Sequence, residues 1–405
     1  SHLRTYEEAK RAEVAAEKAE KRAAADATKS TVKKINASVE KTTLGDIAGL
    51  AALKSAMEAA EAKNAKKAAK EAAKAALDKG YVHYTPNMGI LPLREAVAEH
   101  IKRQTGVSYD PKTEVMITCG GQQAILLTMK AVLEPGDEVL LPSPGYGLYY
   151  NCAAIADAQV RAYALKAPDF GWGGAEAGER TKMLFINSPH NPTGAVLSKE
   201  ELGQIADFAK ANNLLVVSDE AYDRLLYDGL EHRSIASEPG MRDRTVILGS
   251  FSKTYSMTGW RIGYLAGPAE VIRGMALLQQ SFVLSVNSFA QWGAVEAMTG
   301  PQDCVEEMRQ QFDIRRKAMM EALSTIPNVS FAAPKGAFYI YLNHEKTGLD
   351  PVRFCAKLLD EYYVACVPGS EYGPYAGCNT RLSCATGLDD CLEGVDRIRK
   401  MVASL

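Results

Sequence analysis

Six short apolar runs follow one another between residues 114 and 266, and they determine the predicted fold. Each run is predominantly apolar and rich in Val, Ile or Leu; the runs are residues 114–118, 138–141, 182–186, 214–218, 245–248 and 263–266. Short continuous apolar runs are typical of strands that are covered on both faces of a parallel sheet. The pattern therefore predicts a buried, mostly parallel β-sheet.

Helical patterns separate these runs. A helix is expected from Gln122 to Leu133, and another over residues 198–212, where Ser198 and Glu201 have the spacing of an N-terminal capping box. Strands that alternate with helices predict an open α/β sheet. Residues 81–286 are therefore predicted to form one large α/β domain.

The pattern changes at both ends of this domain. After about Asn287, a long helical stretch leads into two strand-like runs within residues 329–342, so residues 287–405 are predicted to form a smaller α+β domain. Residues 1–80 contain 24 alanines, 17 Lys and Arg, and 12 Asp and Glu, a composition that favours helices with few large apolar side chains. We expect these residues to form an extended helical arm that lies on another surface or on a partner subunit.

Composition and charge exclude several classes of protein. Hydrophobic residues make up 47% and charged residues 24% of the chain, as in globular proteins, and no apolar run approaches the roughly 20 residues that cross a bilayer. The formal net charge is −2, and acids are interleaved with the basic residues of the arm, so we expect no nucleic-acid or membrane partner. The eight cysteines form no C-x-x-C pair, which argues against a zinc site and favours a reducing, cytoplasmic compartment.

Polar and charged residues follow the ends of the predicted strands, where ligands bind in open α/β sheets. The segments are Gly120-Gly121, Asn187-Ser-Pro-His-Asn-Pro-Thr-Gly194, Asp219-Glu-Ala-Tyr222 and Gly249-Ser-Phe-Ser-Lys253, with Gly259-Trp-Arg261 shortly after. Two glycines at the start of a helix leave backbone N–H groups free to bind a phosphate. Ser250, Ser252 and Arg261 can donate to the same phosphate.

Two further residues indicate which phosphorylated group would bind. Lys253 is a candidate for a Schiff base, because burial and nearby cations lower the pKa of a lysine. Asp219 can hold a pyridine nitrogen protonated, so that the ring withdraws electrons, while Tyr222 and Asn191 can donate to a phenolic oxygen on the ring. Together these residues describe a site for pyridoxal 5′-phosphate (PLP).

Several motifs, in this order along the chain, resemble those of the class I/II aminotransferases of PLP fold type I. They are Tyr84-Thr-Pro-Asn-Met-Gly89, Ser188-Pro-His-Asn-Pro-Thr-Gly194, Ser218-Asp-Glu-Ala-Tyr222, Ser250-Phe-Ser-Lys-Thr-Tyr-Ser-Met-Thr-Gly-Trp-Arg-Ile-Gly263 and Arg381-Leu-Ser-Cys-Ala385. The resemblance covers residues 80–405. It implies an α/β fold with a mostly parallel large domain and a smaller α+β C-terminal domain, and PLP as the cofactor.

The resemblance also implies a role for each matching residue. Lys253 would be the Schiff-base lysine that carries the proton, Asp219 the partner of the pyridine nitrogen, and Tyr222 and Asn191 the partners of the ring oxygen. The phosphate would be held by Gly120, Gly121, Gln122, Ser250, Ser252 and Arg261, and Tyr146 would stack on the ring.

Three further positions would bind the substrate or join two subunits. Arg381, assisted by Asn191, would clamp the substrate α-carboxylate, and Gly45 lies in the nearest match to a glycine segment that touches this carboxylate. Tyr84 would reach the phosphate of a neighbouring subunit, which implies a homodimer with shared active sites.

The resulting prediction is a ping-pong transamination between an L-amino acid and a 2-oxo acid. The neutral Gln122 weakens the case for dicarboxylic substrates, so neutral or aromatic amino acids are expected. Two alternatives stay open: a PLP-dependent C–S β-lyase or aminocyclopropane-carboxylate synthase-like enzyme on the same scaffold, and a non-enzymatic regulator that resembles an aminotransferase.

Overall fold

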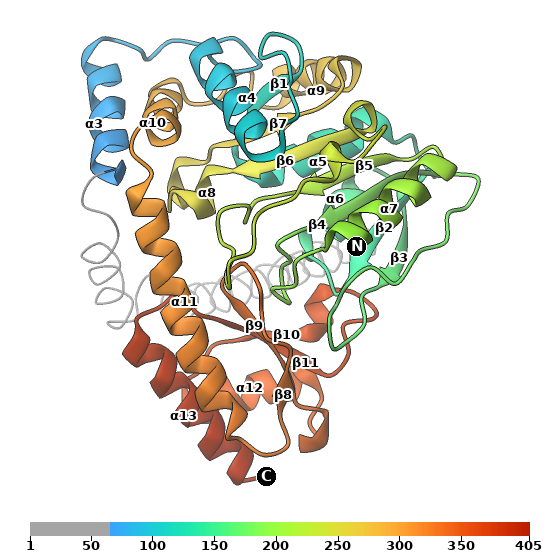
Figure 1. The fold of residues 1–405 in the computed structure, drawn as a ribbon, viewed down its shortest axis with the longest axis vertical. Coiled ribbons are helices and arrows are strands. Elements are labelled where there is room, and N and C mark those ends of the chain that lie inside the picture. The colour runs from blue at the N-terminus through green and yellow to red at the C-terminus, as the bar shows by residue number, and fades with distance from the viewer. Residues whose placement is uncertain (1–64) are drawn as a thin grey trace, which may run out of the picture. The chain divides into compact units, whose positions relative to one another are not determined.

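The computed structural model describes residues 65–405, and most of the predicted arm, together with Gly45, lies outside this range. Seven strands form the larger sheet in the order β1-β7-β6-β5-β4-β2-β3 (Figure 1). Their bounds are β1 (Val115–Thr118), β2 (Glu138–Ser143), β3 (Gln159–Ala164), β4 (Thr181–Asn187), β5 (Leu215–Asp219), β6 (Thr245–Ser250) and β7 (Gly263–Ala266). Strand β7 runs antiparallel to both of its neighbours, and the other pairs are parallel.

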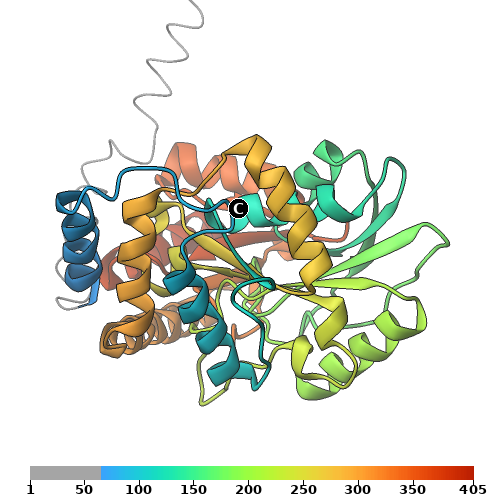
Figure 2. The ribbon, with the colours of Figure 1, turned by 90° about the horizontal axis from the view of Figure 1, so that it is seen from above.

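Both faces of this sheet are covered, as the continuous apolar runs predict. The helices concerned are α4 (Leu91–Thr105), α5 (Gly120–Val132), α6 (Leu148–Ile155), α7 (Lys199–Ala211), α9 (Ala269–Phe282) and α10 (Ser288–Thr299). In β1, Met116 belongs to an apolar core with residues of α5, α6 and α9, whereas Val115 and Ile117 belong to another with residues of α4 and α10. Figure 2 shows helical ribbons on both sides of the strands. Because successive residues of a strand point to opposite faces, every position of such a strand has to be apolar.

Strand β3 lies at the edge of the sheet and was not predicted. Its first two residues, Gln159 and Val160, are exposed, and its sequence is interrupted by Arg161. An edge strand has one neighbour and is partly solvated, so it lacks the apolar run that identifies the central strands.

The predicted capping box at the start of α7 is confirmed. The Ser198 hydroxyl accepts a hydrogen bond from the Glu201 N–H at 3.2 Å, and the Glu201 carboxylate accepts one from the Ser198 N–H at 2.7 Å. The N–H groups of Ser198 and Glu201, which have no partner within the helix, are therefore hydrogen-bonded by side chains close in sequence.

The C-terminal part contains a four-stranded antiparallel sheet in the order β10-β11-β9-β8. The strands are β8 (Ser330–Phe331), β9 (Tyr339–Asn343), β10 (Val367–Pro368) and β11 (Asn379–Ser383); the helices are α11 (Asp303–Ser324), α12 (Pro351–Tyr362) and α13 (Leu388–Ala403). All of these elements except β10 contribute to one apolar core. The expected α+β character of the C-terminal end is therefore observed.

The end of the predicted arm is a helix, α3 (Ala65–Asp78), which packs against α10. Ala69 of this helix belongs to the same apolar core as residues of β1 and α4. The predicted domain limits at residues 80 and 286 stay predictions. Among residues 65–405, no helix is long and apolar enough to cross a membrane, and the predicted cytoplasmic location stays a prediction.

Candidate active site

A cavity of about 370 Å³ opens at the carboxyl ends of β4, β5 and β6, where the sequence places its polar segments. The predicted site residues that line it are Gly121, Gln122, Tyr146, Asn191, Asp219, Tyr222, Ser250, Ser252, Lys253, Arg261 and Arg381. They come from segments up to 260 residues apart in the chain. The parallel strands bring them together because their carboxyl ends lie at one edge of the sheet.

One end of the cavity has the chemistry of an anion site. Helix α5 begins at Gly120 with no side chain capping it, so backbone N–H groups are exposed at the positive end of its dipole. The Arg261 guanidinium lies beside this end, where its Nη2 donates to the Cys119 carbonyl at 3.4 Å. Gly120 has φ +79°, and a Cβ there would stand 2.5 Å from Arg261 Nη2. The close approach of helix and guanidinium therefore requires glycine.

Lys253 lies in the short helix α8 (Phe251–Thr254), which follows β6 directly. The Ser250 hydroxyl caps this helix by accepting a hydrogen bond from the Ser252 N–H at 3.2 Å. Burial lowers the pKa of the Lys253 amine, and the positive charges of Arg381 and Arg261 lower it further. The site thus favours the neutral amine, which is the nucleophilic and basic form.

Asp219 ends β5 and is buried in the floor of the cavity. Its Oδ2 accepts a hydrogen bond from the Tyr149 hydroxyl at 2.5 Å, and its Oδ1 accepts one from the Ala221 N–H at 3.1 Å. Burial raises the pKa of Asp219 to about 6, against these two hydrogen bonds, which lower it. A cationic partner in the cavity would restore the charged form of the carboxylate.

The opposite wall combines Asn191, Arg381, Tyr222 and Tyr339. Arg381 Nη1 donates to Asn191 Oδ1 at 3.0 Å, and the guanidinium carbon lies 4.3 Å from the centre of the Tyr339 ring. The hydroxyls of Tyr222 and Tyr339 are 2.8 Å apart and hydrogen-bonded. Arg381 Nε is buried, and within the described part of the chain it has no hydrogen-bond partner. The guanidinium therefore retains donors for a carboxylate that enters the cavity.

Not every predicted residue lines the cavity. Tyr84 does not line the cavity, and its side chain is 83% exposed. Gly45 lies outside the described residues. Gly120 does not line the cavity either, but it is adjacent to Gly121, which does.

Tyr149, Tyr339 and Asn187 belong to the site, yet the sequence did not identify them. The Tyr149 hydroxyl donates a hydrogen bond to Asp219, and the hydroxyls of Tyr339 and Tyr222 are hydrogen-bonded to each other. The Asn187 side chain donates to the Asp219 carbonyl at 2.9 Å. Asn187 begins the motif that ends at Gly194, and this position was its only sequence signal. Nothing in the spacing of the two tyrosines marks them, because their partners are far away in the chain.

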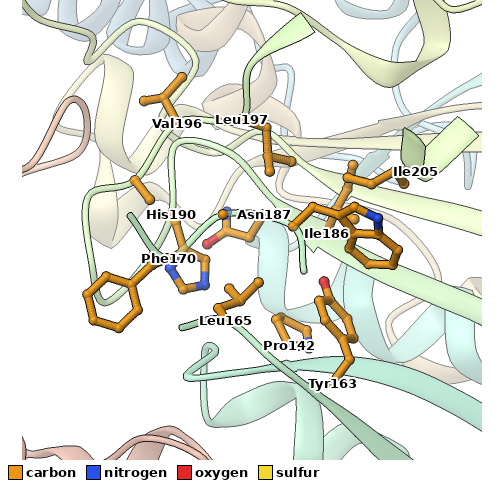
Figure 3. Close-up of a pocket in the computed structure, with 13 residues that line it drawn as sticks. Pro142, Tyr163, Leu165, Phe170, Ile186, Asn187, His190, Val196, Leu197 and Ile205 are labelled. Atoms are coloured by element: carbon orange, nitrogen blue, oxygen red, sulfur yellow. The ribbon is translucent and has the colours of Figure 1, made fainter. Parts of the chain in front are cut away.

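A second, much smaller cavity of about 20 Å³ lies behind Asn187, which lines both cavities (Figure 3). Its wall is mostly apolar and includes Tyr163, Phe170 and Ile205, with His190 and Asn187 as polar members. His190 Nδ1 lies 2.7 Å from the Thr193 hydroxyl, and burial lowers the pKa of His190 to about 3. His190 is therefore neutral, and the hydrogen bond to Thr193 gives it a structural role in the loop.

Solved structures with this fold define the class of protein. The aromatic aminotransferase from Pyrococcus horikoshii OT3 superposes with a TM-score of 0.80 and 40% sequence identity, covering 83% of this chain and 92% of that chain. The present fold is accordingly PLP fold type I.

The sequence comparisons identify the family. The profile of the family Aminotransferase class I and II matches residues 24–398. Aromatic-amino-acid aminotransferase 2 of Thermococcus litoralis and an aspartate aminotransferase of Pyrococcus abyssi are each 41% identical over 336 residues, which are 81% of this chain and 86% of either relative. The chain belongs to the class I and II aminotransferase family, and it is an aminotransferase.

Proposed function

We propose that this aminotransferase uses PLP to move the amino group of an L-amino acid to a 2-oxo acid by a ping-pong mechanism. The observation that carries the proposal is the position of Lys253, a half-buried amine of lowered pKa in one cavity with Asp219 and Arg381. The resemblance of the site motifs to the family supports the same assignment of residues.

The donor set of the cavity fits PLP. The exposed N–H groups of α5, the hydroxyls of Ser250 and Ser252 and the Arg261 guanidinium suit a phosphate dianion. Asp219 suits a protonated ring nitrogen, and the Tyr222 and Asn191 side chains suit the ring oxygen. When bound, PLP supplies a reactive aldehyde and an electron-withdrawing ring.

The chain's own residues then have separate tasks. Arg381 binds the α-carboxylate of the substrate and orients the amino acid in the cavity. Lys253, when it is neutral, takes the proton from the substrate α-carbon and holds it on Nζ until it is returned. Asp219, as a carboxylate, stabilises positive charge in the floor of the site.

The substrate class follows from the charges in the cavity. Among the described residues that line it, Lys253, Arg261 and Arg381 are the cations, and each already has one of the tasks above. Gln122 is neutral, while Tyr146 and Tyr339 are aromatic. The preferred donors are therefore neutral or aromatic L-amino acids.

The active form is proposed to be a homodimer. Tyr84 and Val82 are exposed in one segment, and Phe282 is exposed at the end of α9. The Asn87 side chain donates to the Ala276 carbonyl in α9 at 3.1 Å, so the segment that follows Tyr84 lies against α9. Exposed apolar residues are frequent at protein interfaces, and a second copy of the chain would cover these.

The visible absorption spectrum tests the proposed function. Wild-type protein with PLP should show a visible band that individual L-amino acids bleach while the 2-oxo acid product accumulates, and Lys253→Ala should abolish both. Pyruvate and ammonia formed without any acceptor acid would instead indicate the β-lyase. A protein that takes up no PLP would contradict the proposal and favour a regulator.

A further inference from the structure

A second buried carboxylate lies directly behind the proposed site. Asp223 follows Tyr222 in the turn after β5, but it does not line the active-site cavity, and it is only 6% exposed. An ionised side chain in such a place costs free energy unless it is paired and hydrogen-bonded. Asp223 therefore needs partners that offset this cost.

Asp223 uses both of its oxygens to join different segments. Oδ2 lies 3.0 Å from His100 Nε2 in helix α4, and Oδ1 accepts a hydrogen bond from the Thr254 hydroxyl at 3.2 Å. His100 and Thr254 are both buried. One carboxylate thus connects α4, the Asp219–Asp223 turn and helix α8.

The hydrogen bond to Thr254 links Asp223 to the helix that carries Lys253. Thr254 is the last residue of α8, and Lys253 directly precedes it. Tyr222 directly precedes Asp223 at the other end of the same hydrogen bond. Two residues that line the cavity, from segments about 30 residues apart, are therefore tied together from behind.

The carboxylate keeps its charge in this position. Burial raises the pKa of Asp223, but the hydrogen bond from His100 and the charges of His100, His232 and Arg224 outweigh it, so that the pKa is lowered. A hydrogen bond to an ionised acceptor is stronger than one to a neutral acceptor in the same place. The Thr254 hydroxyl is thus held by a stronger acceptor than a neutral amide would provide.

We propose that Asp223 is a positioning residue which, through Thr254, fixes Lys253 relative to Tyr222 and Asp219. This inference rests on the proposed function, in which Lys253 carries the proton. Asp223 does not touch the substrate, so its loss should slow proton transfer and leave substrate binding largely intact. A misplacement of about 1 Å can cost about a hundredfold in rate when reacting groups must be aligned.

The test replaces one hydroxyl. In Thr254→Val the side chain keeps its volume and loses its donor, and kcat should fall about tenfold, a size that corresponds to the loss of one charge-assisted hydrogen bond, while KM changes by less than about twofold. Thr254→Ser keeps the donor and should restore kcat. Asp223→Asn keeps a weaker acceptor and should lower kcat in the same direction, and the double variant should be no slower than the slower single variant, because both changes act on the same hydrogen bond.

A matched control separates positioning from folding. Thr128 is fully buried in α5, and its hydroxyl donates to the Ala124 carbonyl at 2.8 Å, away from the cavity. Thr128→Val should lower thermal stability about as much as Thr254→Val and leave kcat unchanged. Equal losses of kcat in both variants would overturn the proposal, and so would additive losses in the double variant.

A measurement on the PLP-free protein tests the positioning of Lys253 without any assumption about the reaction. The pH dependence of Lys253 labelling by an amine-reactive reagent reports the environment of this amine. If Thr254→Val lets the lysine move away from Arg381 and Arg261, the apparent pKa of labelling should rise, and Thr254→Ser should leave it as in wild type. An unchanged profile in Thr254→Val would refute the positioning role, whereas a wild-type protein without PLP uptake would refute the proposed function alone.

Discussion

The Tyr149 hydroxyl donates a 2.5 Å hydrogen bond to Asp219 Oδ2, and both side chains are buried beneath the active-site cavity. This bond favours the ionised form of Asp219, against the burial that raises its pKa to about 6. The ability of Asp219 to pair with a cationic ring therefore depends on a residue that does not line the cavity.

Tyr149→Phe should remove the hydrogen bond that favours the ionised form of Asp219. Without the hydroxyl, the pKa of Asp219 rises further, so a larger fraction of the protein holds Asp219 protonated near neutral pH. We expect PLP affinity to fall about tenfold and the acid limb of the kcat profile to move to higher pH. Absorption titrations with PLP and rate measurements across pH 5–9 check this, and an unshifted acid limb would speak against it.

Asp219→Asn should abolish activity and yet stabilise the PLP-free protein. The carboxyl has a higher pKa folded, about 6, than its ordinary value of 3.8. The protonated carboxyl of Asp219 therefore makes its full contribution to the free energy of unfolding below about pH 4. This contribution is lost as the pH rises through 6. Above pH 6 the variant should gain up to about 3 kcal/mol over wild type, and at pH 4 the gain should vanish. Urea unfolding of PLP-free protein at both pH values measures it.

His232→Gln should destabilise the protein most in acid. His232 Nε2 lies 2.7 Å from Glu220 Oε2, and both side chains are buried. Burial lowers the pKa of His232, but the charge and hydrogen bond of Glu220 outweigh it and raise the pKa above its ordinary value. The stabilisation is complete below about pH 6.5 and is lost as the pH rises through the folded pKa.

At pH 6 the loss in His232→Gln should be about 3 kcal/mol, and it should shrink as the pH rises. Thermal denaturation from pH 5 to 9 tests this. His83→Gln serves as the control, because His83 is exposed whereas His232 is buried against Glu220. A loss that does not change with pH would contradict the assignment of charge to this pair.

Gly120→Ala should damage the proposed phosphate site. The positive φ of Gly120 is strained for alanine, and its Cβ would collide with Arg261 Nη2. Moving the guanidinium should weaken PLP binding by about tenfold or more, with a smaller effect on kcat at saturating PLP. Gly203→Ala is the matched control, since a Cβ at Gly203 meets no atom within 4 Å. Equilibrium dialysis with PLP measures both variants.

The central strands could be predicted because each has to be apolar on both faces. The run Val115–Thr118 has Met116 facing one helical layer and Ile117 the other, so its sequence alone identifies it. Strand β3 has an exposed start and escaped prediction. The capping box of Ser198 and Glu201 was predictable for a different reason, since its partners are three residues apart.

The sequence by itself determined which polar and charged residues follow the strand ends, Lys253 and Asp219 among them, because the carboxyl ends of parallel strands meet at one edge of the sheet. Only the tertiary structure decided how those residues are supported. Tyr149 meets Asp219 across 70 positions, and His100 meets Asp223 across 123. Contacts of this kind depend on how helices pack over the sheet. The periodic pattern of apolar residues does not predict which side chains this packing brings together.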